Sequence, residues 1–195
     1  MTEKFLTVNP YSRPGKVRPE TRALVIHWTA KPHQDWKGVW QYFEDRKNGK
    51  LEYGSAQYVI GLNGDVVKMM PDNEVAYHCG SSKIDPASGK IYTDLARSKF
   101  KRYATDLTNL SPNMVMLGIE FCVIADTGEM NDATIEAGLD LSAYICKKYG
   151  LDPMTDVLLH KDVVGWKNCH QWWVTYPEGW KNFKADVKQR MEKSL

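Results

Sequence analysis

The sequence has few cysteines, and they are widely spaced. Four occur in 195 residues, at Cys79, Cys122, Cys146 and Cys169. An even count permits disulfides, but a chain that is made in the cytoplasm tends to keep its thiols reduced. One of these thiols therefore has to be considered as a metal ligand.

Long apolar runs and an excess of one charge are also missing. No run approaches the ~18 residues of a membrane-spanning helix, and residues 1–16 contain no apolar stretch of signal-peptide length. We therefore expect a protein that is made in the cytoplasm without a signal peptide and does not insert into a membrane. The formal net charge of +2 is too small to indicate nucleic acid as a partner, because nucleic-acid-binding domains carry a clustered basic patch. It is compatible with an anionic polymer.

The composition is that of an ordinary globular protein. With 43% hydrophobic and 26% charged residues, the chain suits one compact domain over residues 1–195. It contains no internal repeat, no low-complexity tract and no interdomain linker. Residues 1–20, which are rich in Pro, Gly and Arg, are expected to form an irregular N-terminal arm on the surface.

Several short apolar segments predict strands. Residues 23–28, 115–124 and 157–159 are continuous apolar runs, which are typical of strands buried on both faces of a sheet. Residues 56–62 and 66–70 flank an Asn-Gly pair, which is a strong signal for a hairpin turn.

Helical segments alternate with these strands. Apolar residues recur at helical spacing over 36–43. A longer helix is predicted from Asn131, a good N-cap, to Tyr149, with Gly150 as the stop signal. A last helix follows Thr175. The alternation predicts an α/β domain built around one sheet.

Two histidines stand at the ends of predicted strands. His27 closes the first buried run and His160 follows the last one, and sites in α/β sheets form at the carboxyl ends of strands. A catalytic zinc needs three protein ligands and one open position. Cys169 comes far enough after His160 for the chain to turn back to the same metal, while Asp162 and His170 compete for the third position.

A carboxylate interrupts the central apolar run. Glu120 lies within residues 115–124, and a buried carboxylate is costly unless it is paired or functional. One interpretation is a Glu satisfied by a nearby lysine or by backbone donors, and the other is a general base that activates water at the metal. Lys167 would place a cation in the same cleft, where it would lower a thiolate pKa or stabilise an oxyanion.

His78 and three tryptophans have two interpretations each. His78 is either a loop residue near the turn at Gly80 or a cleft residue that contacts substrate or assists proton transfer. Trp28, Trp36 and Trp40 fit a core or a cleft wall, and Trp28, beside the first strand-end histidine, could also serve as a sugar platform.

Five motifs occur in the order found in the N-acetylmuramoyl-L-alanine amidases of the type-2 amidase family, and the chain resembles that family over nearly its whole length. The family includes phage endolysins, bacterial autolysins and peptidoglycan-recognition proteins. The motifs are Leu24-Val25-Ile26-His27-Trp28, Ser55-Ala56-Gln57-Tyr58-Val59-Ile60, Glu74-Val75-Ala76-Tyr77-His78-Cys79-Gly80, Gly118-Ile119-Glu120-Phe121-Cys122, and His160-Lys161-Asp162-Val163-Val164-Gly165 with Lys167-Asn168-Cys169. Residues 9–16 also look like the start of endolysin amidase domains from Gram-positive hosts.

The resemblance implies a fold, a metal and a reaction. The fold is a mixed, mainly parallel central sheet flanked by helices, with one zinc ion in a surface groove. The reaction is hydrolysis of the amide that joins N-acetylmuramic acid to L-alanine in peptidoglycan. By position, His27, His160 and Cys169 match the zinc ligands, Glu120 matches the catalytic acid and Lys167 matches the lysine that stabilises the transition state.

The resemblance also suggests substrate contacts, with some departures from the family. His78, Trp28 and Gln57 are the predicted substrate-binding residues, although many relatives have His where this chain has Gln57. Trp166 looks like an extra residue before the Lys-x-Cys pair, and His170 replaces a proline. Asp162 therefore stays the second choice as a ligand.

The favoured biological interpretation is a phage or prophage endolysin. Such a protein acts as a monomer on peptidoglycan in the bacterial cell wall after its release from the cytoplasm. Two alternatives remain: a non-catalytic peptidoglycan-binding module, which needs no third metal ligand, and a cytoplasmic amidase that recycles muropeptides. Segment 81–113, with several Lys and Arg residues, is either a solvated basic surface or a lid over the substrate.

Overall fold

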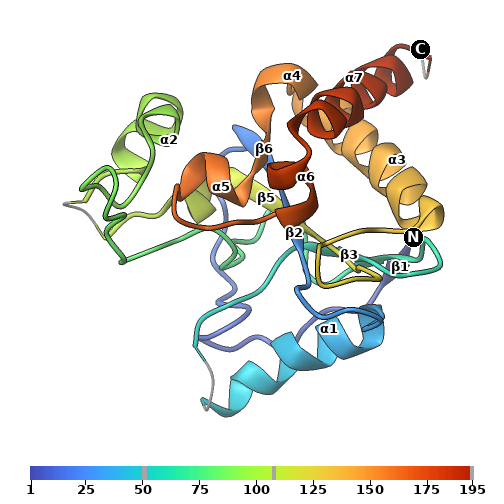
Figure 1. Cartoon of the computed structure of the whole chain (residues 1–195). Coiled ribbons are helices and arrows are strands. Elements are labelled where there is room, and N and C mark those ends of the chain that lie inside the picture. The colour runs from blue at the N-terminus through green and yellow to red at the C-terminus, as the bar shows by residue number, and fades with distance from the viewer. Residues whose placement is uncertain (50–51, 107–108, 194–195) are drawn as a thin grey trace.

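The protein is built around one sheet with helices on both faces (Figure 1). The computed structural model describes residues 1–49, 52–106 and 109–193. The strands are β1 (Thr2–Glu3), β2 (Ala23–Trp28), β3 (Tyr58–Ile60), β4 (Val66–Lys68), β5 (Met116–Phe121) and β6 (Val157–Leu159). The α-helices are α1 (Trp36–Glu44), α2 (Asp94–Phe100), α3 (Asp132–Tyr149), α4 (Pro153–Asp156), α5 (His160–Val163), α6 (Gln171–Thr175) and α7 (Pro177–Lys193). Short 3₁₀ helices are η1 (Asp45–Asn48), η2 (Lys101–Tyr103) and η3 (Pro112–Val115).

The sheet is mixed and mainly parallel, as predicted. Its strand order is β1-β4-β3-β5-β2-β6. The β3–β4 hairpin is antiparallel, and the other neighbouring pairs are parallel. The register places His27 of β2 directly opposite Glu120 of β5. Because paired residues point to the same face, two predicted site residues are neighbours through strand pairing alone.

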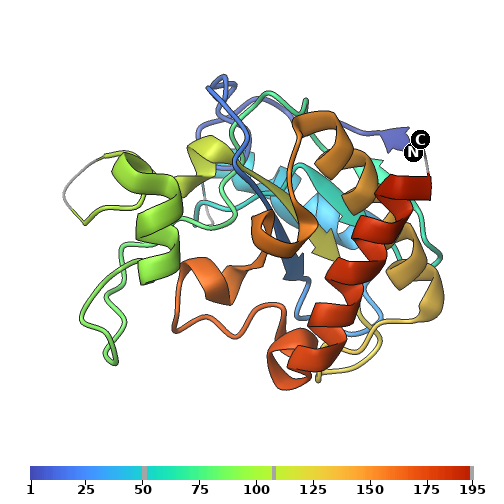
Figure 2. The same ribbon diagram turned by 90° about the horizontal axis from the view of Figure 1, so that it is seen from above.

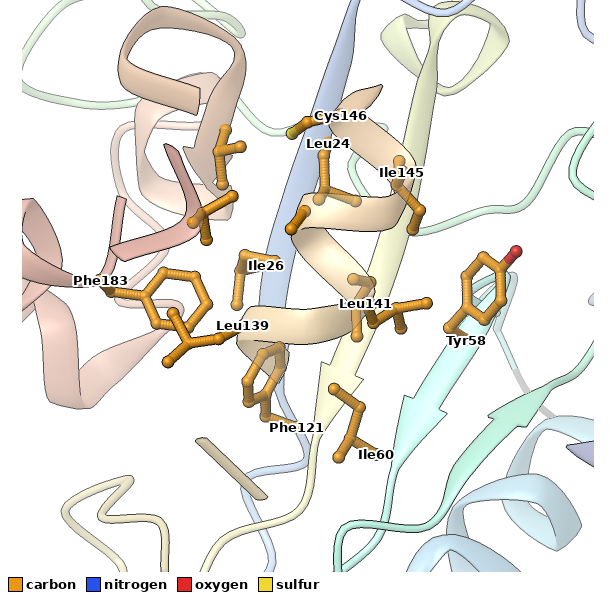
Figure 3. Packing of buried hydrophobic residues seen from close by; sticks show 14 of the residues in the cluster. Leu24, Ile26, Tyr58, Ile60, Phe121, Leu139, Leu141, Ile145, Cys146 and Phe183 are labelled. Atoms are coloured by element: carbon orange, nitrogen blue, oxygen red, sulfur yellow. The ribbon is translucent and has the colours of Figure 1, made fainter. Parts of the chain in front are cut away.

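Alternate side chains of the central strands point to opposite faces of the sheet and pack in different hydrophobic clusters. Leu24 and Ile26 point toward α3 and α7, where Leu141, Ile145 and Phe183 cover that face of the sheet (Figure 3). Helices α3 and α7 lie side by side in both ribbon views (Figures 1 and 2). The intervening residues of the strands point to the opposite face, which therefore also carries His27 and Glu120.

The opposite face of the sheet is covered by two separate clusters. Val59 and Val67 pack with Val39 and Phe43 of α1. At the other end, Ala23 and Val25 of β2 belong to a cluster that includes residues of α2 and of α5. The site residues of the sheet lie on this face, between the two clusters.

The predicted helix and hairpin signals are confirmed. The Asn131 side chain accepts a hydrogen bond from the Thr134 backbone N–H at 3.0 Å and caps α3, and Gly150 closes the helix in the left-handed region. Gly64 also has a positive φ, of 79°, in the hairpin turn, a conformation that glycine adopts at little cost.

The N-terminal arm is less irregular than predicted. Thr2–Glu3 forms β1 and pairs in parallel with β4. The pairing continues beyond the strand, because the Leu6 N–H donates to the Met69 carbonyl at 2.8 Å. The Pro and Gly content of the arm predicts irregular structure. It cannot predict that the edge of the sheet at β4 is free to pair with residues 2 and 3. Within the described part of the chain, no helix combines the length and the apolar character needed to cross a membrane.

Candidate active site

Three histidines from separate segments meet above the carboxyl end of β2. The His27 Nε2 and His78 Nδ1 atoms are 3.0 Å apart. The ring centroids of His27 and His160 are 4.9 Å apart, in an edge-to-face arrangement. His160 reaches this point because β6 pairs with β2 and ends one residue before it. The predicted meeting of the two strand-end histidines is thus found in the structure.

A missing side chain makes room for His78. A Cβ on Gly118 of β5 would lie 2.7 Å from Cγ of the His78 ring. The ring therefore packs directly on the β5 backbone, next to His27. Asn113 fixes the segment from the other side, since its Oδ1 accepts hydrogen bonds from the backbone N–H groups of His78 and Cys79.

Two thiols lie near the paired histidines. The Cys169 Sγ atom is 3.6 Å from Nδ1 of His27. One ligand atom each of His27, Cys79 and His160 also lie within 4.8 Å of one another. Of the four cysteines, the sequence favoured Cys169 as the ligand, although the position of Cys79 next to His78 was also a usable signal.

The donor set suits a zinc ion. Burial lowers the pKa of His160 and of His78 to about 3, and it holds the pKa of His27 well below its usual value. These imidazoles are therefore neutral, which is the form that binds metals. Burial raises the pKa of the Cys169 thiol, while a hydrogen bond to it from the Trp28 backbone lowers that pKa. Neutral imidazoles and a cysteine sulfur, which binds the metal as a thiolate, match the ligands that zinc prefers.

Glu120 is held in an environment that disfavours its charged form. Burial raises its pKa to about 8, and the opposing effects of Lys167 and Arg46 are smaller. Its Oε2 atom is buried and has no hydrogen-bond partner among the described residues. The interpretation of Glu120 as a carboxylate satisfied by ordinary pairing is therefore wrong for this oxygen. A carboxyl group that titrates near neutral pH can both take and return a proton.

The segment that follows His160 folds back and returns Cys169 to the site. The Cys169 carbonyl accepts a hydrogen bond from the Lys161 N–H at 2.9 Å. Within the loop, the Lys167 N–H donates to the Val164 carbonyl at 3.0 Å. The loop leaves the Lys167 side chain exposed at the cavity, with its Nζ 5.0 Å from the centre of the Trp166 ring.

An open cavity of about 440 Å³ connects these groups. Its lining includes His27, His78, Glu120, His160, Lys167 and Cys169. Trp28 lines it too, which agrees with a place in the cleft wall. Tyr42 and Phe43 of α1 line it as well, together with Ser55, which precedes β3, and Tyr77, which follows β4. One surface hollow therefore contains a carboxyl group, a cation and side chains that can bind a metal.

Three candidate residues lie elsewhere. Gln57 is fully buried and does not line the cavity; its amide accepts from the Gly118 N–H and donates to the Glu74 carbonyl. Its place in the prediction came from the motif alone, and the structure gives it a structural role. Asp162 accepts from the Leu159 N–H at 2.8 Å and lines a different hollow.

His170 is also directed away from the cavity. It is fully buried among aromatic rings, with its ring centroid 4.6 Å from that of Trp173. Neither ring nitrogen has a hydrogen-bond partner among the described residues. Tyr42, Ser55 and Tyr77 also line the cavity. The sequence did not single them out: Ser55 and Tyr77 lie within two of the motifs but are not groups that carry the proposed chemistry, and Tyr42 lies outside the motifs.

Two buried imidazoles at strand ends and a thiol from the segment between α5 and α6, with a carboxyl group and a lysine beside them, define a candidate metal-dependent hydrolase site. A profile of the N-acetylmuramoyl-L-alanine amidase family matches residues 17–172, so the chain belongs to this family.

Curated relatives agree with the family. The chain is 30% identical over 190 residues to N-acetylmuramoyl-L-alanine amidase BlyA of Bacillus subtilis (strain 168). The matched stretch covers 97% of this chain and 47% of the relative. It is 31% identical over 170 residues to a probable N-acetylmuramoyl-L-alanine amidase of Bacillus licheniformis, covering 87% of this chain and 42% of the relative. The chain thus spans just under half the length of these relatives.

Solved structures share the fold. The catalytic domain of XlyA superposes with a TM-score of 0.68 at 20% identity, covering 95% of this chain and 97% of that one. PlyL gives a TM-score of 0.65 at 14% identity, with 96% of both chains covered. At these identities the likeness establishes the α/β fold.

Proposed function

We propose that this chain is a zinc-dependent N-acetylmuramoyl-L-alanine amidase of the endolysin type. It would hydrolyse the amide between N-acetylmuramic acid and L-alanine in peptidoglycan. The observation that carries the proposal is the convergence of His27, His160 and Cys169 in a cavity that Glu120 and Lys167 also line. The family of the chain supports the choice of substrate.

Cys169 is the better third ligand, although Cys79 is also within reach. A catalytic metal must keep one position open toward the substrate. Cys169 lines the cavity together with the two histidines, whereas Cys79 does not line it and lies in an apolar cluster with Tyr92 and Val163. A metal held by Cys169 would face the cavity. If Nδ1 of His27 is the ligand atom, its Nε2–H is free to donate to His78, and such a second hydrogen bond fixes the orientation of a ligating ring.

The protein groups around the cavity can carry the proton transfers. When bound, zinc supplies a Lewis acid that polarises the scissile carbonyl and lowers the pKa of water from 15.7 toward ~7. Glu120 accepts the proton of the attacking water on its carboxylate and returns it to the leaving amine of L-alanine. The Lys167 ammonium faces the oxygen of the scissile carbonyl and stabilises the negative charge that develops there.

The setting proposed for this activity is the bacterial cell wall. The chain would act as a monomer on wall peptidoglycan after release from the cytoplasm. A non-catalytic binding module is less consistent with the site, because a receptor needs neither a third metal donor nor a carboxyl group tuned to titrate near pH 8. A muropeptide-recycling amidase would use the same chemistry and differs in requiring soluble substrates.

The ligand set is tested by replacing each thiol in turn. We expect Cys169→Ser to lose most bound zinc and most amidase activity. Cys79→Ser is the matched control, since it removes a buried thiol that lies within 4.8 Å of ligand atoms of both histidines, and it should retain both zinc and activity. Zinc is measured by mass spectrometry of metals after dialysis, and folding by circular dichroism. Full zinc in Cys169→Ser, or its loss in Cys79→Ser alone, would assign the third ligand to Cys79.

A further inference from the structure

A second hollow adjoins the active-site cavity. It has a volume of about 580 Å³. Tyr77 lines both hollows, and the wall continues along the chain from Ser55 in the first to Tyr53 in the second. A substrate that is bound over the histidines can therefore extend across Tyr77 into this second space.

An exposed aromatic ring forms one wall of the second hollow. Tyr53 is 65% exposed, so much of its side chain is accessible to a ligand from solvent. Its ring is held in place by two neighbours, because its centroid lies 5.4 Å from that of Tyr11 and 5.4 Å from that of Tyr77. The ring is thus a fixed platform with apolar surface facing solvent.

The rest of the hollow is polar and carries no positive charge. Ser81, Ser82, Ser111 and Asn113 line it together with Glu52 and Gly80, and none of its described lining residues is Lys or Arg. Gly80 lets the chain pack closely on the polar groups of this wall, since a Cβ there would lie 3.0 Å from both the Ser111 Oγ and the Asn113 Nδ2 atoms.

We propose that this second hollow, bounded by Tyr53, Tyr77 and Ser82, is a subsite for the glycan strand beyond the muramic acid that bears the scissile bond. An aromatic platform beside hydroxyl and amide groups matches the apolar ring face and polar rim of a neutral N-acetylated hexose. The stem peptide carries carboxylates, which the Glu52 carboxylate would repel and which no cation in the hollow would bind. The peptide is therefore assigned to the first cavity, which Lys167 lines. This inference rests on the proposed function.

The test compares two substrates with the same stem peptide. One carries the peptide on a single N-acetylmuramic acid and the other carries it on a tetrasaccharide. We expect the unmodified protein to have a higher kcat/KM for the tetrasaccharide. Tyr53→Ala removes the platform and Ser82→Trp fills the hollow, and each should lower the ratio of the two kcat/KM values by roughly three- to tenfold. Tyr144→Ala, which removes a half-exposed tyrosine of α3 outside both hollows, should leave the ratio unchanged.

A binding measurement separates this inference from the proposed reaction. Binding of a peptide-free tetramer of N-acetylglucosamine is followed by nuclear magnetic resonance titration of the unmodified protein and of the Tyr53→Ala variant. Weaker binding to Tyr53→Ala supports the subsite even if neither substrate is cleaved, an outcome that would overturn only the proposed reaction. If the tetramer does not bind, or if the substrate ratio and the tetramer affinity are the same in Tyr53→Ala and Ser82→Trp as in the unmodified protein, the subsite is wrong.

Discussion

At the scale of single residues, the site combines groups that gain little stability from their position. Glu120 is buried with one oxygen unpaired, and His27 and His160 are buried in the neutral form. Such groups lose hydration on folding without recovering it in full. This loss of hydration energy is expected where a carboxyl group and imidazoles serve to bind a ligand rather than to stabilise the protein interior.

Replacing Glu120 should separate metal binding from turnover. We expect Glu120→Gln to retain zinc, because Glu120 is not a proposed ligand, and to lower kcat by about 10²-fold or more, because the general base is lost. Zinc content and the rate of L-alanine amine release are measured on the same preparation. Turnover within a few-fold of the parent would remove Glu120 from the mechanism.

Glu120→Gln should also be more stable than the parent protein, and this advantage should increase with pH. The pKa of Glu120 is about 8 in the folded protein, and it is near 4.3 in an unfolded chain. Between these values the unfolded state releases a proton that the folded state keeps, so the contribution of Glu120 to stability falls as pH rises. In metal-free protein, we expect the difference in Tm between Glu120→Gln and the parent to grow from pH 5.5 to pH 8, reaching roughly 5 °C. A difference that is independent of pH would contradict the raised pKa.

At the scale of elements, β2, β5 and β6 place the site, and the sequence predicted them well. Their apolar runs were long enough to identify, and the parallel pairing that the fold requires then aligned His27 with Glu120. The loop that carries Cys169 could be predicted only from the motif, since its turn depends on backbone hydrogen bonds such as that between Lys161 and Cys169. The short strand β1 was missed because two residues carry no periodicity.

The contact of β5 with the His78 ring gives a prediction at this scale. Gly118→Ala places a methyl group 2.7 Å from the ring, so His78 or the strand must shift. We expect a loss of about 1–3 kcal/mol in the free energy of unfolding, measured by urea denaturation. In a His78→Ala background the ring is gone, and Gly118→Ala should then cost much less. Equal costs in both backgrounds would show that His78 is not what the methyl group meets.

At the scale of the whole molecule, the cavity is formed by parts that are far apart in the sequence. Its wall is formed in part by helix α1, by the segments that contain Ser55 and Tyr77 on either side of the β3–β4 hairpin, and by the segment after β6. The strand-end rule and the motifs predicted the chemical groups, but they could not predict the wall residues Tyr42 and Tyr77, whose position depends on how helices and loops pack across the sheet. Packing also explains why Gln57, a predicted substrate contact, does not line the cavity. Gln57 lies in one of the motifs, but its side chain forms hydrogen bonds with the backbone of Gly118 and Glu74 instead. The role of segment 81–113 as lid or basic surface stays a prediction, and its residues 107 and 108 lie outside the described part of the chain.

The central claim is the amide bond that is cut and its dependence on the metal. Purified peptidoglycan is digested with the protein, with the protein plus a zinc chelator, and with the chelated protein after zinc is added back, and the new chain ends are identified by mass spectrometry. The account predicts new free L-alanine N-termini that disappear with the chelator and return with zinc. New reducing sugar ends, or L-alanine termini that persist in the chelator, would contradict it.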